Sequence, residues 1–500
     1  QMQIELNNYP VAVLGAGTMG EGIAQTAASA GHPVMLYDVS QQQLETAFEN
    51  IAKRLERSVK KGKITAEKRD QILKNLSPRK TLGELDQAKL VIEAIIEDIA
   101  IKQEVFCKLE LLLADDVILA TNTSSIDLNK MGSVLKRPQH LVGMHFFNPA
   151  PIMALVEIVR SKDTTSAVAD TVFTLAEKWG KSPVNVRSSP GFIVNRVARP
   201  FYSEALEVLK EGGTDVAGCD TIMRDCGFFR MGPFELMDLI GLDVNYSVTC
   251  QIWESYQRHP RFAPSKLQKE LVDSGHLGRK SGKGFFEYGE NAENAFVQNA
   301  LQTSAPDSFI IEGPEHLPDS LRKLLEGSSV TAENTSGNGY IRLPEGGVIV
   351  PSNGKSSTDR SVEIGQTVIS LDLCLDFEQT PRIVLAPSFE CPEIVFLQAV
   401  GLFQSLGKQV SVIKDVAGMV LTRTVAMLAN EASLLVQEEV ADAAGVNLAM
   451  RKGVNYPVGP LEWGEQWGWN SVVETLDNLH QLNPERYQTS EWLRQKIKLI

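Results

Sequence analysis

The sequence contains few cysteines for its length, and they are not clustered. The six cysteines are scattered over 500 residues, and no two of them form a Cys-x-x-Cys pair. Disulfide frameworks and structural zinc sites need grouped cysteines, so we expect neither a disulfide scaffold nor a bound metal. Reduced thiols in a cytoplasmic protein fit this pattern.

Long hydrophobic runs and an excess of positive charge are also missing. No apolar stretch approaches the length that spans a bilayer, and the N-terminus opens into a strand pattern without a signal-peptide arrangement. The net charge of −13 argues against a nucleic-acid partner, because neutralising phosphates requires surplus lysine and arginine. We therefore expect a cytoplasmic protein without a membrane or nucleic-acid partner, in which a local basic patch could still bind a small anion.

The chain is too long for one hydrophobic core, and its pattern changes three times. Short apolar runs first alternate with helical patterns, which is typical of a Rossmann-type doubly wound sheet. Amphipathic helices follow, then a segment rich in Gly, Ser and Pro with short strand-like pieces, and then helices again. We predict four domains: a Rossmann domain in 1–189, a helical domain in 190–288, a degenerate Rossmann-like domain in 289–414 and a second helical domain in 415–500.

The helical part of the chain is duplicated. Residues 175–241 align with 402–468 at a constant offset of 227 without a gap, so that Arg196 matches Arg423. Chance would not produce such agreement over this span, so we infer an internal repeat. The segment 289–414 then takes the place of the first sheet domain but is shorter. The expected fold is an α/β sheet domain and an all-α domain, followed by a degenerate second copy of both.

A glycine loop, Gly15-x-Gly17-x-x-Gly20, lies between a strand pattern and a helix of small residues. The next strand ends at Asp38, eighteen residues beyond Gly20, which completes the context of a dinucleotide fingerprint. The glycines permit a tight turn, a close approach of the pyrophosphate and close packing of helix on sheet. Asp38 can accept hydrogen bonds from the adenosine ribose and would repel a 2′-phosphate, which favours NAD over NADP. A glycine turn without a ligand is the alternative.

A histidine, His145, ends an apolar strand pattern and is followed by Phe146-Phe147-Asn148-Pro149. Histidine suits proton transfer near neutral pH, and Glu157 is a candidate orienting carboxylate. The polar run 121–125 follows another strand and is expected at the same carboxyl edge of the sheet, and Asn195 could return to this cleft from the helical domain. Alone, His145 would be a core histidine; the predicted hydride acceptor favours a catalytic role instead.

Together these motifs resemble the L-3-hydroxyacyl-CoA dehydrogenases of fatty-acid β-oxidation and related catabolism. The resemblance covers residues 9–288, and its motifs occur in the family's order: the glycine loop, 91–97, 122–125, 145–149, 190–196 and 232–236. It implies an NAD-dependent enzyme that interconverts 3-hydroxyacyl-CoA and 3-oxoacyl-CoA thioesters.

The resemblance also implies roles for single residues. His145 would be the general base that takes the 3-hydroxyl proton, and Glu157 would orient its ring. Ser124 and Asn195 would hold the reacting oxygen of the substrate. The residues implied for the NAD site are Gly15, Gly17, Thr18, Met19, Gly20, Asp38, Glu97, Lys102, Asn122, Ser124, Asn148 and Lys280.

A basic stretch, 54–63, precedes the second half of the predicted sheet and contains Lys60 and Lys61. One interpretation is a clamp for the phosphates of coenzyme A, in which these two lysines bind substrate. The other is a solvated helix end. The family resemblance favours the clamp.

The second half of the chain carries its own resemblance. Residues 399–404, 424–428 and 453–457 resemble long bacterial members of the family, the phenylacetate-pathway enzymes that act on 3-hydroxyadipyl-CoA. This implies 3-hydroxyadipyl-CoA as substrate, with 3-hydroxybutyryl-CoA as the alternative. A dehydrogenase of free hydroxy acids and a non-catalytic NAD-binding relative are further alternatives.

The second copy departs from the catalytic pattern. Thr422 stands where the first copy has Asn195, and neither the histidine motif nor a glycine fingerprint precedes it. We therefore expect one active site per chain and a silent second copy. The duplicated helical domain would fill the place of a second subunit, as an internal pseudo-dimer; a homo-oligomer is the other arrangement.

Overall fold

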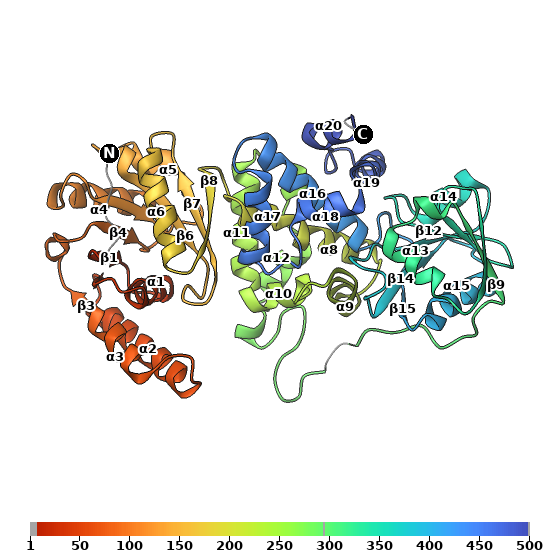
Figure 1. Ribbon diagram of the computed structural model, residues 1–500, viewed down its shortest axis with the longest axis horizontal. Helices are drawn as coiled ribbons and strands as arrows, with labels where there is room; N and C mark the ends of the chain where they lie inside the picture. The colour runs from red at the N-terminus through yellow and green to blue at the C-terminus, as the bar shows by residue number, and fades with distance from the viewer. Residues whose placement is uncertain (1–7, 294–295, 499–500) are drawn as a thin grey trace. The chain divides into compact units, whose positions relative to one another are not determined.

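The computed structural model describes residues 8–293 and 296–498, and the chain divides into two compact units (Figure 1). The first unit contains the chain up to Val194 together with the segment Glu438–Val454. The second unit contains Asn195–Gln437 and Asn455–Ile500. A piece of the second helical repeat therefore groups with the N-terminal sheet.

The first unit is built on an eight-stranded sheet. Its first six strands are parallel, whereas β7 is antiparallel to β6 and parallel to β8. In spatial order the strands are β3 (Leu76–Arg79), β2 (Val34–Tyr37), β1 (Val11–Leu14), β4 (Leu90–Glu93), β5 (Ile118–Thr121), β6 (Leu141–Phe146), β7 (Leu155–Arg160) and β8 (Ser182–Arg187). The order reverses between β1 and β4, and such a switch point is where doubly wound sheets bind ligands.

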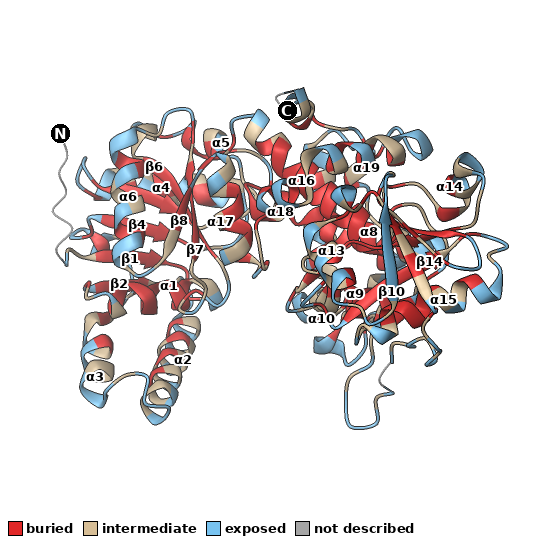
Figure 2. Cartoon of the chain, turned by 45° about the vertical axis from the view of Figure 1, so that its right-hand side comes forward, coloured by how far each residue is buried: buried red, intermediate tan, exposed pale blue. Residues whose placement is uncertain are grey.

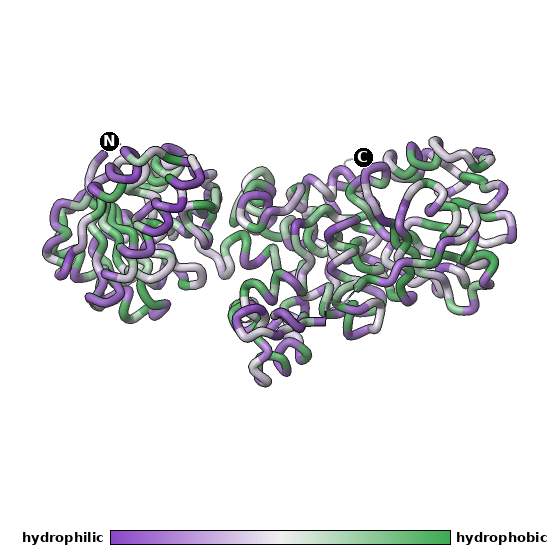
Figure 3. Tube along the Cα trace, turned by 90° about the horizontal axis from the view of Figure 1, so that it is seen from below, coloured by the Kyte–Doolittle hydropathy of each residue, from purple (hydrophilic) through white to green (hydrophobic). Residues whose placement is uncertain are grey.

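Helices cover both faces of this sheet, and short polar side chains begin several of them. Ser40, Asp98 and Thr165 each accept a backbone N–H at the start of a helix, as N-caps do. The central strands β1, β4, β5 and β6 are fully buried, as the red at the centre of this sheet in Figure 2 shows, and the middle of this unit is mainly hydrophobic (green in Figure 3). Apolar clusters lie on both faces of the sheet. The helices are α1 (Thr18–Ser29), α2 (Gln41–Lys60), α3 (Ala66–Asn75), α4 (Ile99–Leu112), α5 (Leu128–Gly132), α6 (Ser166–Lys178) and α17 (Ala443–Gly453), with short 3-10 turns η1 (Leu82–Leu85) and η2 (Pro138–His140).

The second unit contains a seven-stranded sheet that repeats only part of the first. Its strands, in spatial order, are β10 (Thr331–Thr335), β9 (Ser308–Glu312), β11 (Tyr340–Arg342), β12 (Val348–Pro351), β13 (Val368–Leu371), β14 (Arg382–Pro387) and β15 (Gln409–Val412). The last four pair as parallel, antiparallel and parallel neighbours, as β5 to β8 do. Antiparallel pairing of β9, β11 and β12 replaces the parallel β1–β4 half, which in the first copy carries the glycine loop. The prediction of a degenerate second sheet is confirmed.

The helices of the second copy follow those of the first at the offset of 227. The corresponding pairs are α8 (Arg199–Glu211) and α16 (Leu421–Gln437), α9 (Val216–Gly227) and α17, α10 (Pro233–Ile240) and α18 (Pro460–Trp467), and α11 (Leu242–Ser255) and α19 (Trp469–Leu482). The other elements are α7 (Val194–Val197), η3 (Pro260–Phe262), α12 (Lys266–Asp273), η4 (Arg279–Ser281), η5 (Pro314–His316), α13 (Asp319–Glu326), α14 (Ser357–Ile364), α15 (Glu393–Ser405) and α20 (Glu491–Lys498).

The two copies exchange equivalent helices between their sheets. In the first unit α17, from the second copy, packs on β7 and β8, and just before it the carbonyl of Val440 accepts the N–H of Arg187 at 2.8 Å. In the second unit α9, from the first copy, packs on β14, and Asp225 accepts from Nε of Arg382 at 2.9 Å. Each copy thus supplies the helix that covers the other copy's sheet.

Buried ion pairs repeat this exchange within the second unit. Nε of Arg196 donates to Glu431 at 2.9 Å, and Nε of Arg423 donates to Glu204 at 3.2 Å. At the offset of 227, Arg196 corresponds to Arg423 and Glu204 to Glu431, so the two ion pairs are equivalent by the repeat. Such reciprocal contacts define a two-fold interface, which here lies inside one chain.

Several features are absent from the described residues. None of their helices combines the length and apolar character that crossing a bilayer would require. Across the same residues, no three His, Cys, Asp or Glu side chains gather as they would around a metal ion. All six cysteines are free thiols.

Candidate active site

The glycine loop joins β1 to α1 at the switch point of the first sheet. A Cβ added at Gly20 would lie 1.7 Å from the carbonyl oxygen of Gly15, so only glycine fits there. Around a Cβ added at Gly17, by contrast, no atom lies within 4 Å, which leaves open space before the helix N-terminus. Thr18 and Met19 form the first turn of this helix. Because the N-terminal end of a helix attracts anions, this space suits a dinucleotide pyrophosphate.

Asp38 follows β2 and is held beside the glycine loop. Its carboxylate accepts the N–H of Ala16 at 2.8 Å and the N–H of Ser40 at 2.8 Å. These bonds use two of the lone pairs and leave others for a ligand. The carboxylate is therefore fixed in position while still able to accept hydrogen bonds from a ribose.

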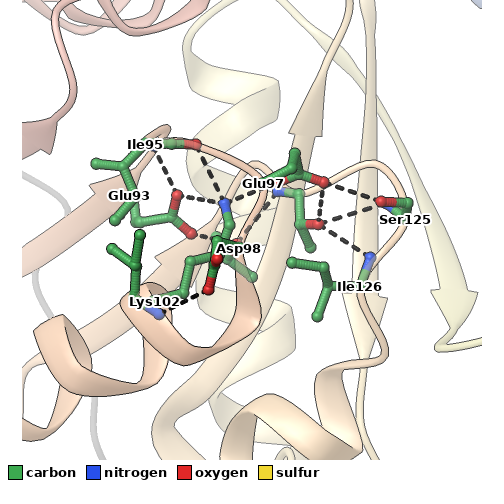
Figure 4. A network of polar contacts seen from close by, with 10 residues as sticks. Glu93, Ile95, Glu97, Asp98, Lys102, Ser125 and Ile126 are labelled. Carbon is green, nitrogen blue, oxygen red and sulfur yellow. Dashed lines mark hydrogen bonds and ion pairs between the residues drawn. The ribbon is translucent and has the colours of Figure 1, made fainter.

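A polar network, buried at Glu93 and Lys102 and partly exposed at Glu97, lies at the carboxyl ends of β4 and β5 (Figure 4). Nζ of Lys102, in α4, contacts Glu93 at 2.6 Å, Glu97 at 2.8 Å and the carbonyl of Ile95 at 3.4 Å. The other oxygen of Glu93 accepts from the hydroxyl of Thr121 at 2.7 Å. The three N–H groups of Lys102 are thus all directed at protein acceptors, so this residue can act on a ligand only by positioning Glu97.

Glu97 in turn holds the polar loop that follows β5. Its second oxygen accepts from the hydroxyls of Thr123 at 2.8 Å and Ser125 at 3.0 Å. Burial opposes ionisation of Glu97, but the charge of Lys102 and the hydrogen bonds it receives outweigh burial and lower its pKa. Glu97 is therefore a fixed carboxylate on the side of the loop that contains Ser124.

Asn122 ties this loop to the strand that carries the histidine. Its Oδ1 accepts the N–H of Phe146, the last residue of β6, at 2.8 Å. Ser124, next in the loop, is half-buried, and no hydrogen bond is recorded for its side chain within the described residues. Asn148 is exposed on the segment after β6. All of these positions lie at one edge of the first sheet.

His145 and Glu157 are directly opposed in the antiparallel pair β6–β7. Nδ1 of His145 lies 2.8 Å from one oxygen of Glu157, and the other oxygen accepts the N–H of Ile193 at 2.8 Å. Glu157 is fully buried, and His145 is 7% exposed. A carboxylate can only accept, so Nδ1 carries a proton, and the neutral form of the ring would present its lone pair at Nε2. This is the tautomer that a general base requires.

Two of the residues implied by the resemblance lie in the second unit. The carbonyl of Asn195 accepts from Nε of Arg199 at 2.7 Å, and its side chain is partly exposed. Nζ of Lys280 lies 2.6 Å from Asp243 in an ion pair that is partly exposed on both sides.

The basic stretch 54–63 is the end of α2 and the turn after it. Lys60 and Lys61 are exposed there, and within the described residues no ion pair is recorded for either. Arg54 is different, because it pairs with Glu21 at 2.7 Å. The exposed lysines are thus available to an anion, whereas Arg54 already has a carboxylate partner.

Sequence patterns did not single out Lys181 as part of this region. Its Nζ donates to the carbonyls of Ala150 at 2.5 Å and Met153 at 2.8 Å, and so holds the segment after Asn148. Burial lowers the pKa of Lys181 to about 8. Its repeat counterpart, Lys408, donates to the carbonyl of Thr380 at 2.7 Å. Thr380 corresponds to Met153 at the offset of 227, so the second copy repeats this contact. The sequence signal that could have identified Lys181 is the pair Gly180-Lys181, which recurs in the second copy as Gly407-Lys408.

The second copy has lost the histidine–carboxylate pair. By strand register and by the offset of 227, Asp372 stands where the first copy has His145, and Val384 stands where it has Glu157. Asp372 is fully buried, and its carboxylate accepts from the N–H of Val420 at 3.1 Å and from the N–H and hydroxyl of Thr422 at 2.9 and 2.7 Å. This position therefore holds the start of α16 instead of facing a ligand.

Comparison with known proteins identifies the family. Residues 10–189 match the NAD-binding domain of 3-hydroxyacyl-CoA dehydrogenases, and 191–288 and 418–499 match the C-terminal domain of the same enzymes. Residues 349–416 match a reduced Rossmann-fold domain of 3-hydroxybutyryl-CoA dehydrogenase. The predicted fold class, NAD as cofactor and the family resemblance are confirmed.

The chain is similar to relatives of two lengths. It is 39% identical over 496 residues to a 3-hydroxyadipyl-CoA dehydrogenase of Escherichia coli (strain K12), covering 99% of this chain and 98% of the relative. A probable 3-hydroxybutyryl-CoA dehydrogenase of Bacillus subtilis (strain 168) is 41% identical over 280 residues, covering 56% of this chain and 97% of that protein. A crystal structure of a 3-hydroxybutyryl-CoA dehydrogenase from Escherichia coli K12 is similar over 99% of both chains, with a TM-score of 0.90 and 38% identity. The chain therefore belongs to the family of NAD-dependent 3-hydroxyacyl-CoA dehydrogenases.

Proposed function

We propose that this dehydrogenase oxidises 3-hydroxyadipyl-CoA to 3-oxoadipyl-CoA. The observation that carries the acyl assignment is the similarity to the 3-hydroxyadipyl-CoA dehydrogenase, which extends over both copies and 99% of the chain. A 3-hydroxybutyryl-CoA substrate is the second candidate, favoured by the equally long similarity to the crystal structure of that name. The two candidates share the thioester and the 3-hydroxyl, and they differ beyond C3, where the adipyl chain is two carbons longer and ends in a carboxylate.

His145 is the proposed general base. Its Nε2 takes the proton of the 3-hydroxyl, and Glu157 keeps the ring oriented and stabilises the imidazolium that forms. NAD, bound at the glycine loop, supplies the acceptor for the hydride that leaves C3. Ser124 and Asn195 hold the reacting oxygen, so that the proton is directed at His145.

The remaining residues bind and position. Asp38 accepts from the adenosine ribose, and the N-terminal turn of α1 with Thr18 and Met19 binds the pyrophosphate. Lys102 positions Glu97 and does not itself bind, because its N–H groups are occupied. Asn122, Asn148 and Lys280 complete the proposed cofactor site. Lys60 and Lys61, exposed at the end of α2, bind coenzyme A phosphates in this proposal.

Parallel assays of the reverse reaction test the acyl assignment. We expect kcat/KM for NADH oxidation to be at least about tenfold higher with 3-oxoadipyl-CoA than with acetoacetyl-CoA, because one buried charge-assisted hydrogen bond contributes at least that much. A preference for acetoacetyl-CoA would establish the butyryl alternative. Turnover of the free oxo acids at a comparable rate would instead establish a free hydroxy-acid dehydrogenase.

We further propose that the four predicted domains form an internal pseudo-dimer, with only the first copy active. The exchanged helices α9 and α17 and the reciprocal Arg–Glu pairs support this arrangement. The loss of the histidine and glutamate at Asp372 and Val384 supports a structural role for the second copy. In this role α17 covers β7, the strand that carries Glu157.

A chain ending at residue 288 tests the pseudo-dimer. It would lack α17 and the partners of Arg196 and Glu204, so its own interface would be exposed. We expect it to dimerise or to aggregate, as measured by light scattering coupled to size exclusion, with the full chain as control. A truncated chain that stayed monomeric and fully active would contradict the pseudo-dimer.

A further inference from the structure

The second unit contains a cavity of about 480 Å³ along α8. The cavity lies between this helix and the segment from η3 to α12, and Thr249 of α11 also lines it. Cations outnumber acids in its lining: Arg199, Lys210, Arg261, Lys266 and Arg486 against Glu207. The lining is therefore suited to an anionic group.

Two of the three arginines in this lining already have acidic partners. Nε of Arg261 lies 2.8 Å from Glu431, and Nε of Arg486 lies 3.5 Å from Glu204. Both carboxylates are buried, and each is shared with a further arginine, Glu431 with Arg196 and Glu204 with Arg423, so the protein compensates these two guanidinium charges in part. Arg199 differs from both, because none of the ion pairs within the described residues involves it.

Arg199 is 6% exposed, and no ion pair is recorded for it within the described residues. Its Nε donates to the carbonyl of Asn195 at 2.7 Å, and Nη1 donates to the hydroxyl of Thr249 at 2.7 Å. That hydroxyl gives its own proton to the carbonyl of Asn245, so its lone pair is available to the arginine. Nη2 is left without a recorded acceptor and belongs to a residue that lines the cavity.

A buried cation without a carboxylate is costly, because the hydration that Arg199 loses is replaced only by neutral hydrogen bonds and by a cation–π contact, with its Cζ 5.1 Å from the centre of the Tyr202 ring. The same burial lowers the pKa of Arg199, against weaker opposing interactions with the hydroxyls of Tyr202 and Tyr456. Two fixed hydrogen bonds hold the guanidinium in this position. An anion that entered the cavity would supply the countercharge that Arg199 lacks.

The position of Arg199 also agrees with the length of the proposed substrate. It lies four residues after Asn195, about 6 Å along a helix axis. Three C–C bonds of about 1.5 Å separate C3 from the terminal carboxylate carbon of an adipyl chain, so its oxygens lie about 4–5 Å from C3. With the oxygen on C3 held by Asn195, the terminal carboxylate reaches the next helical turn.

We propose that Arg199 binds the terminal carboxylate of a dicarboxylic acyl chain and selects this chain over an unsubstituted one. The inference rests on the proposed function, since it takes Asn195 as the group that holds the reacting oxygen. Arg199 is then a specificity-determining residue, and a chain that ends in a methyl group leaves its charge uncompensated.

The variant Arg199→Gln tests this role in the full chain, with NADH and both thioesters. Glutamine can keep a hydrogen bond to Thr249 or to the carbonyl of Asn195 but carries no charge. We expect kcat/KM with 3-oxoadipyl-CoA to fall at least about a hundredfold, mainly through KM, since a buried charged partner is lost. With acetoacetyl-CoA we expect a change of less than about fivefold, because that chain has no carboxylate to bind. Lys266→Gln, an exposed cation of the same cavity, is the matched control and should change neither value by more than about twofold.

The outcomes separate this inference from the acyl assignment. If the wild-type enzyme prefers 3-oxoadipyl-CoA and Arg199→Gln lowers both activities equally or neither, the role of Arg199 is overturned and the acyl assignment stands. If the wild-type enzyme prefers acetoacetyl-CoA, the acyl assignment fails and the inference fails with it. Partial recovery of the 3-oxoadipyl-CoA activity by Arg199→Lys would support a charge that binds the substrate, because lysine keeps the charge without the planar fork.

Discussion

Replacing His145 with glutamine is expected to lower kcat at least about a hundredfold, because a positioned base contributes about 10²–10⁴-fold. Glutamine preserves much of the shape and can still hydrogen-bond Glu157, but it cannot take the hydroxyl proton. The affinity for NADH should change little, since the glycine loop between β1 and α1 and Asp38 after β2 are separate from β6, which carries His145. Steady-state rates with 3-oxoacyl-CoA and a fluorescence titration with NADH measure the two quantities.

The second copy offers a matched control for this variant. Asp372→Asn changes the residue that stands in the position of His145 by register and offset. Since Asp372 holds the start of α16, we expect lower thermal stability but a kcat per folded enzyme within about twofold of the wild type. Turnover near the wild-type value in His145→Gln would exclude this histidine as the base. A loss of turnover in folded Asp372→Asn would contradict the assignment of one active site per chain.

Replacing Glu204 with alanine is expected to destabilise the second unit by about 3–5 kcal/mol, because it removes the buried carboxylate that Arg423 and Arg486 share and leaves them only the partly exposed Glu211 and Glu207. Glu204 is fully buried and accepts from Arg423 at 3.2 Å and from the hydroxyl of Tyr487 at 2.8 Å. Glu207→Ala is the matched control: this side chain is 28% exposed and lies 3.9 Å from Arg486, so we expect less than about 1 kcal/mol.

Urea unfolding followed by tryptophan fluorescence measures this loss. Five of the six tryptophans lie in the second unit, so the signal reports mainly on that unit. The reciprocal variant Glu431→Ala should show a loss of the same size, since Glu431 is the repeat counterpart of Glu204 and contacts Arg196 and Arg261. Effects below about 1 kcal/mol in both variants would mean that the exchanged pairs do not hold the two copies together.

The pH dependence of this stability has a definite sign. Burial of Glu431 favours its neutral form, but Arg261 and Arg196 outweigh burial and lower its pKa below the ordinary 4.5. A carboxyl with a lowered pKa in the folded state contributes stability above pH 4.5 that is lost as the pH falls. Glu431→Gln should therefore be less stable at neutral pH and less sensitive to acid than the wild type.

The first copy of the site was predictable because its parts follow local rules. The glycine loop, Asp38 and His145 each stand at a strand end, and parallel strands bring their carboxyl ends to one edge. The pairing of His145 with Glu157 was suggested by residue type and needed the antiparallel register of β6 and β7 to become a contact. Lys102 shows the limit of the family pattern, since only the packed structure shows that its N–H groups are occupied by Glu93, Glu97 and Ile95.

The sequence by itself determined the family and the cofactor, because short motifs identify them, and it determined the duplication, because the two copies align at a constant offset. Tertiary structure alone decided how the two copies use each other. The exchange of α9 and α17, the reciprocal pairs Arg196–Glu431 and Arg423–Glu204, and the cavity around Arg199 all join segments that are distant in the chain. These contacts form because a buried charge needs a partner and an apolar face needs to be covered. The partner comes from whichever segment the fold brings near, so the local sequence pattern does not predict it.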